Sequence, residues 1–326
     1  MCSSQNMFSV IKSNSKYFLV FIFLLGFNIQ AEEYEQVSVE VKAEKFGQNS
    51  YYIPGMSGAA TEFEGFISNA GFIVTKEGVI VFDALGTPSL ANAMLQEIRK
   101  VTDKPIKLLI SSHYHADHIY GLQVFKNEGA EIWAPKGVYN YLDSENSKNL
   151  LEARRTALFP WVNDDTYLVK PDRIIEQDET FEMGGQEFLI SFFGSVHSDG
   201  DLALVNKSDE VLYIGDVIFA GRVPFVGNAD IKKWISTLDR MMKVKTKYLI
   251  PGHGGASEDA KETMALTYEY LNFLIDRFTP VVEDMEEFDN AYQKIDWSKY
   301  ENLPAFEEAN RRNAYSAFLY LERTLQ

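Results

Sequence analysis

Residues 112–118 read Ser112-His113-Tyr114-His115-Ala116-Asp117-His118 and hold three of the chain's five histidines. The run before them, IKLLIS at residues 106–111, is short and apolar and predicts a buried strand. Three imidazoles and a carboxylate converge on one point only if the loop curls, because neighbouring side chains on a strand diverge. The motif H-x-H-x-D-H therefore predicts a metal-binding loop at the end of a strand.

The other two histidines also follow predicted strands. His197 lies just beyond a strand pair that ends at residue 193, and His253 follows a strand at residues 248–250. Asp216 comes directly after another strand. Sheets of α/β proteins place their sites at the carboxyl ends of strands. A single histidine is more often structural than a ligand, but five at strand ends favour a metal centre.

The composition excludes several classes of protein. The 326-residue chain has a formal net charge of −16, with 46% hydrophobic and 24% charged residues, which excludes a largely disordered, fibrous or multi-span membrane chain. An acidic chain without a Lys/Arg cluster is poorly suited to binding nucleic acid. The one cysteine, Cys2, excludes an intramolecular disulfide and a metal site with several thiolates.

The N-terminus has the pattern of a secretory signal. Lys12 and Lys16 precede an apolar run at residues 17–29, and Ala31 precedes two acidic residues. We expect cleavage after Ala31, which makes residues 1–31 a signal peptide and the mature protein periplasmic or secreted. An uncleaved membrane anchor is the alternative, but the apolar run is shorter than the roughly 20 residues that span a bilayer.

Strand patterns alternate with helix patterns along the rest of the chain, which indicates a layered α/β domain. We expect a helix at residues 88–101 capped by Thr87, a second at 231–242, and further helices from a cap at Ser257 onward. Strands are expected at residues 65–75, 79–83, 106–111, 131–134, 180–183, 186–193, 202–206, 211–214 and 248–250. The mature chain then divides into an α/β domain at 32–256 and a helical extension at 257–326 packed on it.

Over about residues 60–256, these motifs resemble those of the metallo-β-lactamase superfamily. The resemblance implies a four-layer αββα sandwich, here with extra C-terminal helices. It also implies two metal sites. One would be formed by His113, His115 and His197, and the other by Asp117, His118 and His253.

The same resemblance assigns roles to three aspartates. Asp216 matches an aspartate that bridges both metals in glyoxalase II-like and lactonase-like members, and it stands where some β-lactamases have a cysteine ligand. Asp83 matches an aspartate that supports the metal loop. Asp201 is a similar supporting candidate.

Metal-assisted hydrolysis is the chemistry that suits these residues. Neutral imidazoles suit zinc, and carboxylates add charge and bridge two ions. Two zinc ions would share a hydroxide that attacks the carbonyl of a small ester, thioester, lactone or lactam. Asp117 is both a ligand and a candidate catalytic acceptor for the nucleophile's proton.

Two further residues are candidates for contact with the substrate. Tyr114 would either hydrogen-bond an oxyanion or pack within the loop. Arg222 would either bind a substrate carboxylate or form a surface ion pair. The segment at residues 136–170 is expected to form a lid or wall, with its aromatic residues lining a pocket or packing on the sandwich.

A narrower resemblance leaves other functions open. Residues 219–230, Trp234 and residues 251–254 are similar to the exported zinc-metallohydrolase branch associated with quinoprotein dehydrogenase and sulfur oxidation systems. One alternative is therefore a metal-binding accessory protein with a periplasmic dehydrogenase as its partner. Another is a mononuclear iron oxygenase like the persulfide dioxygenases of the superfamily. As an enzyme, the protein would act on a small-molecule substrate and would not bind nucleic acid. After signal cleavage, we expect it to have no stable membrane span.

Overall fold

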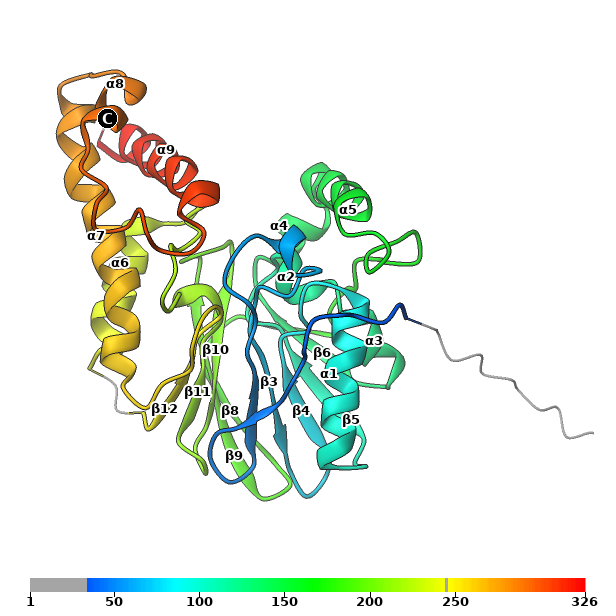
Figure 1. Cartoon of the computed structure of the whole chain (residues 1–326). Coiled ribbons are helices and arrows are strands. Elements are labelled where there is room, and N and C mark those ends of the chain that lie inside the picture. Colours follow the sequence, from blue (N-terminus) through cyan, green and yellow to red (C-terminus); the bar gives the residue numbers. More distant parts are fainter. Residues whose placement is uncertain (1–33, 244–245, 326) are drawn as a thin grey trace, which may run out of the picture. The chain divides into compact units, whose positions relative to one another are not determined.

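The computed structural model describes residues 34–243 and 246–325, so the predicted signal peptide lies outside the described residues. Within this part the strands form two sheets (Figure 1). The first contains, in spatial order, β1 (Glu44–Lys45), β2 (Ser50–Ile53), β3 (Ala70–Val74), β4 (Val79–Phe82), β5 (Ile106–Ile110), β6 (Glu131–Pro135) and β7 (Arg173–Ile175). The second contains β12 (Tyr248–Ile250), β11 (Val211–Tyr213), β10 (Asp201–Asn206), β9 (Gln186–Gly194) and β8 (Glu179–Met183).

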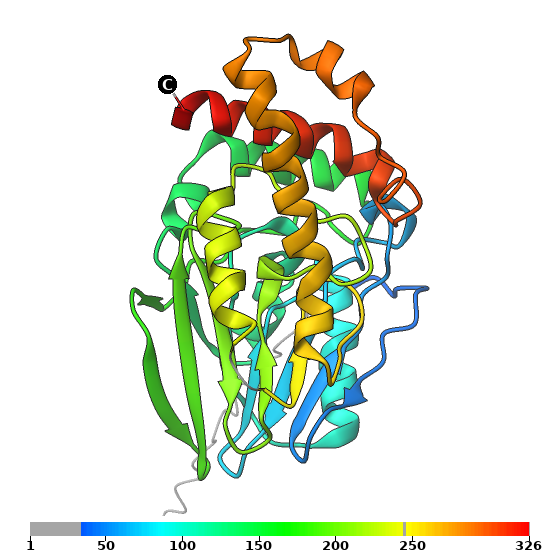
Figure 2. The ribbon, with the colours of Figure 1, turned by 90° about the vertical axis from the view of Figure 1, so that its left-hand side faces the viewer.

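Helices cover the outer faces of both sheets. α1 and α3 lie over the first sheet, and α6 and α7 lie over the second (Figures 1 and 2). The helices are α1 (Pro88–Val101), α2 (Ala116–Ile119), α3 (Leu122–Asn127), α4 (Val138–Leu142), α5 (Glu145–Ala157), α6 (Ile231–Met241), α7 (Ala260–Glu283), α8 (Phe288–Lys294) and α9 (Phe306–Leu325), with short 3₁₀ turns η1 (Ala60–Glu62) and η2 (Gly215–Val217). This is the αββα sandwich with extra C-terminal helices that the sequence predicted.

The alternation of side chains along the strands builds the layers. In β4, Val79 and Val81 pack toward α1, whereas Ile80 and Phe82 pack into the space between the sheets. All four are buried, as expected for a strand covered on both faces. Each such side chain contributes about 1.5–3 kcal/mol when it is removed from water.

Strand direction brings the ends that carry the candidate ligands to one edge. β4, β5 and β6 run parallel, and β11 and β12 run parallel in the other sheet. β10 is antiparallel to β11, so the β9–β10 connection lies beside the end of β11. The backbone N–H of Leu202 donates to the oxygen of Ser112 at 2.9 Å and ties the two sheets together at this edge.

The helix boundaries test the sequence patterns. α1 occupies the predicted residues 88–101, and Thr87 Oγ1 accepts a hydrogen bond from the N–H of Leu90 at 3.0 Å. The predicted cap at Ser257 is wrong, because Ser257 pairs with Leu249 in a β-bridge and Asp259 caps α7 instead. Across residues 34–243 and 246–325, no helix has both the length and the hydropathy to cross a membrane.

Candidate metal centre

The loop that carries the histidine motif curls because a helix starts inside it. After β5, Ser111 Oγ donates to the backbone oxygen of His113 at 2.8 Å. His115, with extended backbone, is the N-cap residue of α2, which carries Asp117 and His118. On a strand these side chains would diverge. The change from strand to helix over this short loop turns them toward one point instead.

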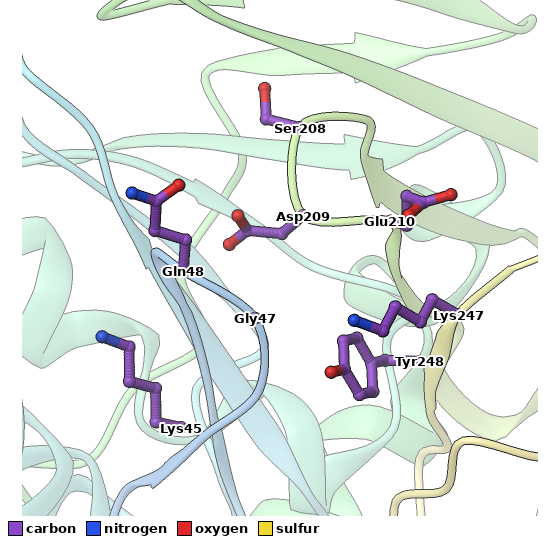
Figure 3. Close-up of a pocket in the computed structure, with 8 residues that line it drawn as sticks. All are labelled: Lys45, Gly47, Gln48, Ser208, Asp209, Glu210, Lys247 and Tyr248. Atoms are coloured by element: carbon purple, nitrogen blue, oxygen red, sulfur yellow. The ribbon is translucent and has the colours of Figure 1, made fainter.

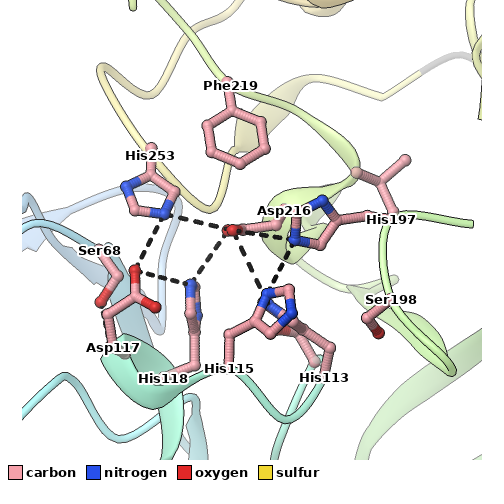
Figure 4. A network of polar contacts seen from close by, with 12 residues as sticks. Ser68, His113, His115, Asp117, His118, His197, Ser198, Asp216, Phe219 and His253 are labelled. Carbon is pink, nitrogen blue, oxygen red and sulfur yellow. Dashed lines mark hydrogen bonds and ion pairs between the residues drawn. The ribbon is translucent and has the colours of Figure 1, made fainter. Parts of the chain in front are cut away.

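Four residues from three loops form a first group of ligand atoms, all within 4.8 Å of one another (Figure 4). His115 Nδ1 lies 3.0 Å from both His113 Nε2 and His197 Nε2. Asp216 Oδ2 lies 3.4 Å from His197 Nε2 and 3.7 Å from His113 Nε2. His197 comes from the β9–β10 connection and Asp216 from η2, so the group joins both sheets.

Asp117, His118 and His253 form a second group beside the first. Asp117 Oδ2 lies 3.2 Å from His253 Nε2 and 3.7 Å from His118 Nε2. Asp216 reaches this group as well: its Oδ1 is 3.0 Å from His118 Nε2 and its Oδ2 is 3.3 Å from His253 Nε2. The structure thus brings together all the predicted ligands, with Asp216 in contact with both groups.

The donor atoms fit a divalent metal better than they fit one another. His115 Nδ1 faces two other ring nitrogens, and one proton cannot satisfy both contacts. His118 Nε2 and Asp216 Oδ1 are buried without a hydrogen-bond partner, although they lie 3.0 Å apart. Burial lowers the pKa of His197 to about 3, so this ring is neutral, which is the form that binds metal. Such imidazole and carboxylate sets are typical of zinc sites.

Asp83 at the end of β4 supports the metal loop. Its Oδ1 accepts from the Ser112 N–H at 2.7 Å, and its Oδ2 accepts from Ser112 Oγ at 2.7 Å. His118 Nδ1 lies 2.9 Å from the same Oδ2, and Ser112 Oγ lies 2.9 Å from His113 Nδ1. A proton held on Nδ1 of both rings leaves both Nε2 atoms free to bind metal. Asp83 therefore has the supporting geometry that the resemblance implied.

Comparison with known proteins agrees with this geometry. The sequence profile described as "Metallo-beta-lactamase superfamily" matches residues 64–253. The chain belongs to this superfamily. With its His/Asp cluster intact, it is a metal-dependent hydrolase of the metallo-β-lactamase fold.

Individual relatives are distant. The chain is 24% identical over 256 residues to the metallo-beta-lactamase type 2 of Elizabethkingia meningoseptica, covering 76% of this chain and 91% of that protein. A metallo-beta-lactamase from Pontibacter korlensis has a TM-score of 0.55 at 19% identity, covering 72% of this chain and 99% of that one. The stereoselective inverting sec-alkylsulfatase Pisa1 from Pseudomonas sp. has a TM-score of 0.66 at 18% identity, covering 87% and 50%. At these identities the structural likeness is one of fold.

Asp201 in this metallo-β-lactamase fold supports the loop of His197. Its carboxylate accepts from the N–H of Val196 at 2.9 Å, from the N–H of Ser198 at 2.9 Å and from Ser198 Oγ at 2.8 Å. Burial raises the pKa of Asp201 to about 6 in spite of these hydrogen bonds. The contacts match the supporting role expected for Asp201.

Arg222 lies against a candidate ligand, His253. Its side chain is buried, and its Nη1 is 3.3 Å from His253 Nδ1. His253 Nδ1 is also 2.7 Å from the backbone oxygen of Ile67, so it donates there and cannot accept from Arg222. The alternative of a surface ion pair is wrong because the side chain is buried. Its binding of a substrate carboxylate stays a prediction, without support from this position.

Tyr114 has a packing role in this structure. Its ring is buried, and its hydroxyl donates to the backbone oxygen of Val169 at 3.1 Å. Burial raises the pKa of the Tyr114 hydroxyl, which keeps it neutral. Of the two interpretations of the sequence, packing fits this hydrogen bond. Tyr114 also lines the cavity beside the first group, and the oxyanion contact stays a prediction.

A cavity of about 580 Å³ lies beside the first group, with His115 and His197 in its wall. The loops at residues 197–200 and 225–228 form two sides of it. α4 and α5 line a third, so the segment at 136–170 is a wall as expected. Of its aromatic residues, Tyr141 lines the cavity, whereas Phe159 and Tyr167 are exposed, at 69% and 45%.

The fourth side of this cavity was not predicted. It comes from α9, which contributes Arg312 and Ser316. These two residues lie four positions apart and share one helix face, but nothing in that spacing indicates a site near residue 115. Figure 2 shows α9 lying across the end of the sandwich where the ligand loops meet.

A second hollow, of about 490 Å³, lies at the opposite ends of the strands, at the β1–β2 and β10–β11 turns (Figure 3). Its buried carboxylate, Asp209, accepts from the N–H of Asn49 at 2.7 Å and from Ser50 Oγ at 2.8 Å. Asp209 therefore ties the two turns together. No candidate metal group lies here among the described residues.

Proposed function

We propose that this protein is a dinuclear zinc hydrolase that cleaves a small ester, thioester, lactone or lactam. The contact of Asp216 with both groups of ligand atoms carries this proposal. A carboxylate whose Oδ2 contacts both groups and whose Oδ1 contacts the second suits two metal ions better than one. The set contains five imidazoles, which bind metal in their neutral form, and two carboxylates. Such a set favours zinc over harder ions such as magnesium.

Zinc in such a set, when bound, lowers the pKa of a water molecule toward about 7 and polarises a carbonyl oxygen. Asp117 supplies the complementary base. Burial raises the pKa of the Asp117 carboxyl, but the nearby His118 and His253 lower this pKa by more. The net effect holds the pKa well below its usual range. Asp117 therefore stays ionised, able to hold a ligand position and to accept a proton through Oδ2.

Aromatic rings shield the ligands on the side of α6 and α7. Phe219 stacks on His253 at 4.8 Å between ring centroids, and Trp234 packs edge-on against His197 at 5.0 Å. Water and substrate therefore reach the ligands from the cavity beside His115. Exclusion of water from the other side strengthens the electrostatic contacts within the site.

Metal analysis of the purified protein, joined to a hydrolysis panel, tests this function. We expect two zinc ions per chain and turnover of at least one ester, thioester, lactone or lactam. The names of the relatives justify including β-lactams and a secondary alkyl sulfate in the panel. One iron per chain with oxygen uptake would contradict the proposal, and so would full zinc occupancy without any turnover, which would favour an accessory role.

We also propose that the protein acts after export, in the periplasm or outside the cell. The signal pattern at residues 1–31 supports export. The narrower resemblance in residues 219–230 supports a periplasmic quinoprotein dehydrogenase as a partner. N-terminal sequencing of the mature protein should start near Glu32, and a chain that begins at Met1 would contradict cleavage.

A further inference from the structure

Arg312 projects from the C-terminal helix α9 into the wall of the cavity that holds His115 and His197. It makes no hydrogen bond or ion pair with any residue that the structure describes. Its neighbour Arg311, in contrast, faces away and pairs with Asp289. An arginine without a partner beside a cavity is an available donor of paired N–H groups.

The charge in the cavity wall is sparse. Among the described residues that line it, Arg312 is the one cation and Asp199 the one carboxylate. The other polar groups are neutral, such as Asn140, Ser144 and Asn228. In a chain with a formal net charge of −16, Arg312 is therefore the group in this wall that attracts an anion.

α9 is fixed against the loop that borders the cavity. Asn313, next to Arg312, accepts a hydrogen bond from the N–H of Val226 at 2.9 Å and donates to the oxygen of Pro224 at 2.6 Å. Phe225, between these two, lies 6.0 Å from the ring of His115. The backbone of Arg312 is thus held at a set place relative to the first group, which a specificity residue requires.

We propose that Arg312 binds an anionic group, a carboxylate, on the acyl part of the substrate while the scissile carbonyl lies at the metal ligands. The inference rests on the proposed function and narrows it to small carboxylate-bearing esters, thioesters, lactones or lactams. Guanidinium matches a carboxylate through two parallel hydrogen bonds, whereas a neutral acyl chain leaves it unpaired. Arg312 would therefore set specificity and take no part in bond cleavage.

A matched pair of substrates tests this role. para-Nitrophenyl hydrogen glutarate carries a terminal carboxylate, and para-nitrophenyl pentanoate has the same chain length without it. Arg312→Gln should lower kcat/KM for the glutarate ester by about 10- to 100-fold, mainly through KM, because a hydrogen bond to a charged group is lost. It should change kcat/KM for the pentanoate ester by no more than about twofold. Equal effects on both esters, or none on the glutarate ester, would overturn the inference.

Two further variants serve as controls. Arg311→Gln removes an arginine from the same helix outside the cavity and should leave both esters unaffected. Arg312→Lys keeps the charge but loses the paired geometry, so its kcat/KM for the glutarate ester should fall between those of the native protein and Arg312→Gln.

A binding measurement separates this inference from the proposed function. If the zinc-loaded native protein hydrolyses neither ester, the proposed hydrolysis of such esters is contradicted. Calorimetric titration with glutarate then still tests the binding role of Arg312. Arg312→Gln should then weaken glutarate binding by about 10- to 100-fold and Arg311→Gln should not. Glutarate binding of equal strength in the native protein and Arg312→Gln, or none in either, would overturn the inference whatever the esterase result.

Discussion

Asp216 contacts four of the five histidines through its two carboxylate oxygens while it is almost fully buried. Asp216→Asn keeps the size of the side chain and removes its negative charge. We expect a folded protein with about one metal per chain and a rate lower by orders of magnitude, because two cations would repel without the carboxylate between them. Metal analysis after dialysis measures this. Two tightly held metals in the variant would instead place Asp216 outside the ligand set and make a lactam the better candidate substrate.

Asp83 allows the metal loop to be tested without touching a ligand. Asp83→Asn retains one acceptor oxygen where the loop uses two, so Ser112 and His118 lose part of their support. We expect zinc affinity to fall by about 10- to 100-fold, as measured by competition with a chelator.

Asp209→Asn is the matched control for Asp83→Asn. Asp209 is also a buried carboxylate that accepts from a backbone N–H and a serine hydroxyl, but at the far end of the strands. Its loss should lower the free energy of unfolding by about 1–3 kcal/mol and leave zinc affinity unchanged. If both variants weakened zinc binding equally, the effect of Asp83 would be one of general stability.

At the scale of elements, α9 is joined to the site through Asn313. Its side chain contacts the backbone of Pro224 and Val226 and the hydroxyl of Tyr270 on α7, at 2.6, 2.9 and 3.1 Å. Asn313→Ala leaves these buried groups without partners and should cost about 1–3 kcal/mol of stability. We expect both metals to remain and kcat/KM to fall, because the loop with Phe225 loosens.

Thermal unfolding, metal analysis and kinetics together check the Asn313→Ala variant. Asn272→Ala is its control, because Asn272 bonds to Tyr268 within α7 and not to the site loop. Loss of metal in Asn313→Ala would contradict a role confined to the substrate side.

The sequence predicted the strongly patterned elements, including the three-residue strands β11 and β12, and missed elements without a clear pattern. α1 has apolar residues at helical spacing, a capping Thr87 and a proline at its first position. Its bounds could therefore be predicted directly from the sequence. α4 spans five residues and α5 has a polar surface with few buried residues, so neither shows a clear apolar period. β7, of three residues, is a strand because β6 lies beside it to pair with, which is information that its own sequence lacks.

At the scale of the molecule, the metal centre was predictable and the cavity was not. Ligand chemistry restricts a metal site to few residue types, and their positions after strands showed where they would meet. The cavity wall has no such restriction. It combines α5 with α9, more than a hundred residues apart in the chain, and Arg312 differs from other surface arginines only through that packing. Arg222, chosen by its closeness in sequence to Asp216, is buried instead against His253.

Metal removal tests how far the centre supports the molecule as a whole. The three apolar clusters, between the sheets and under the two helix layers, do not depend on metal, so the metal-free protein should stay folded. Zinc binds the folded state through residues from both sheets, and at about 1,000 times its dissociation constant it adds about 4 kcal/mol. For a chain of this size that corresponds to a rise in Tm of about 6–7 °C.

Scanning calorimetry of the chelated protein, with and without added zinc, measures this rise. His115→Ala leaves the first metal with one imidazole fewer, so its rise in Tm should be smaller, with one metal lost and hydrolysis nearly abolished. Arg311→Gln, remote from the ligands, should show the full rise. A Tm of the native protein that does not respond to zinc would mean that the two sheets are not joined through a metal, and the ligand assignment would fail with it.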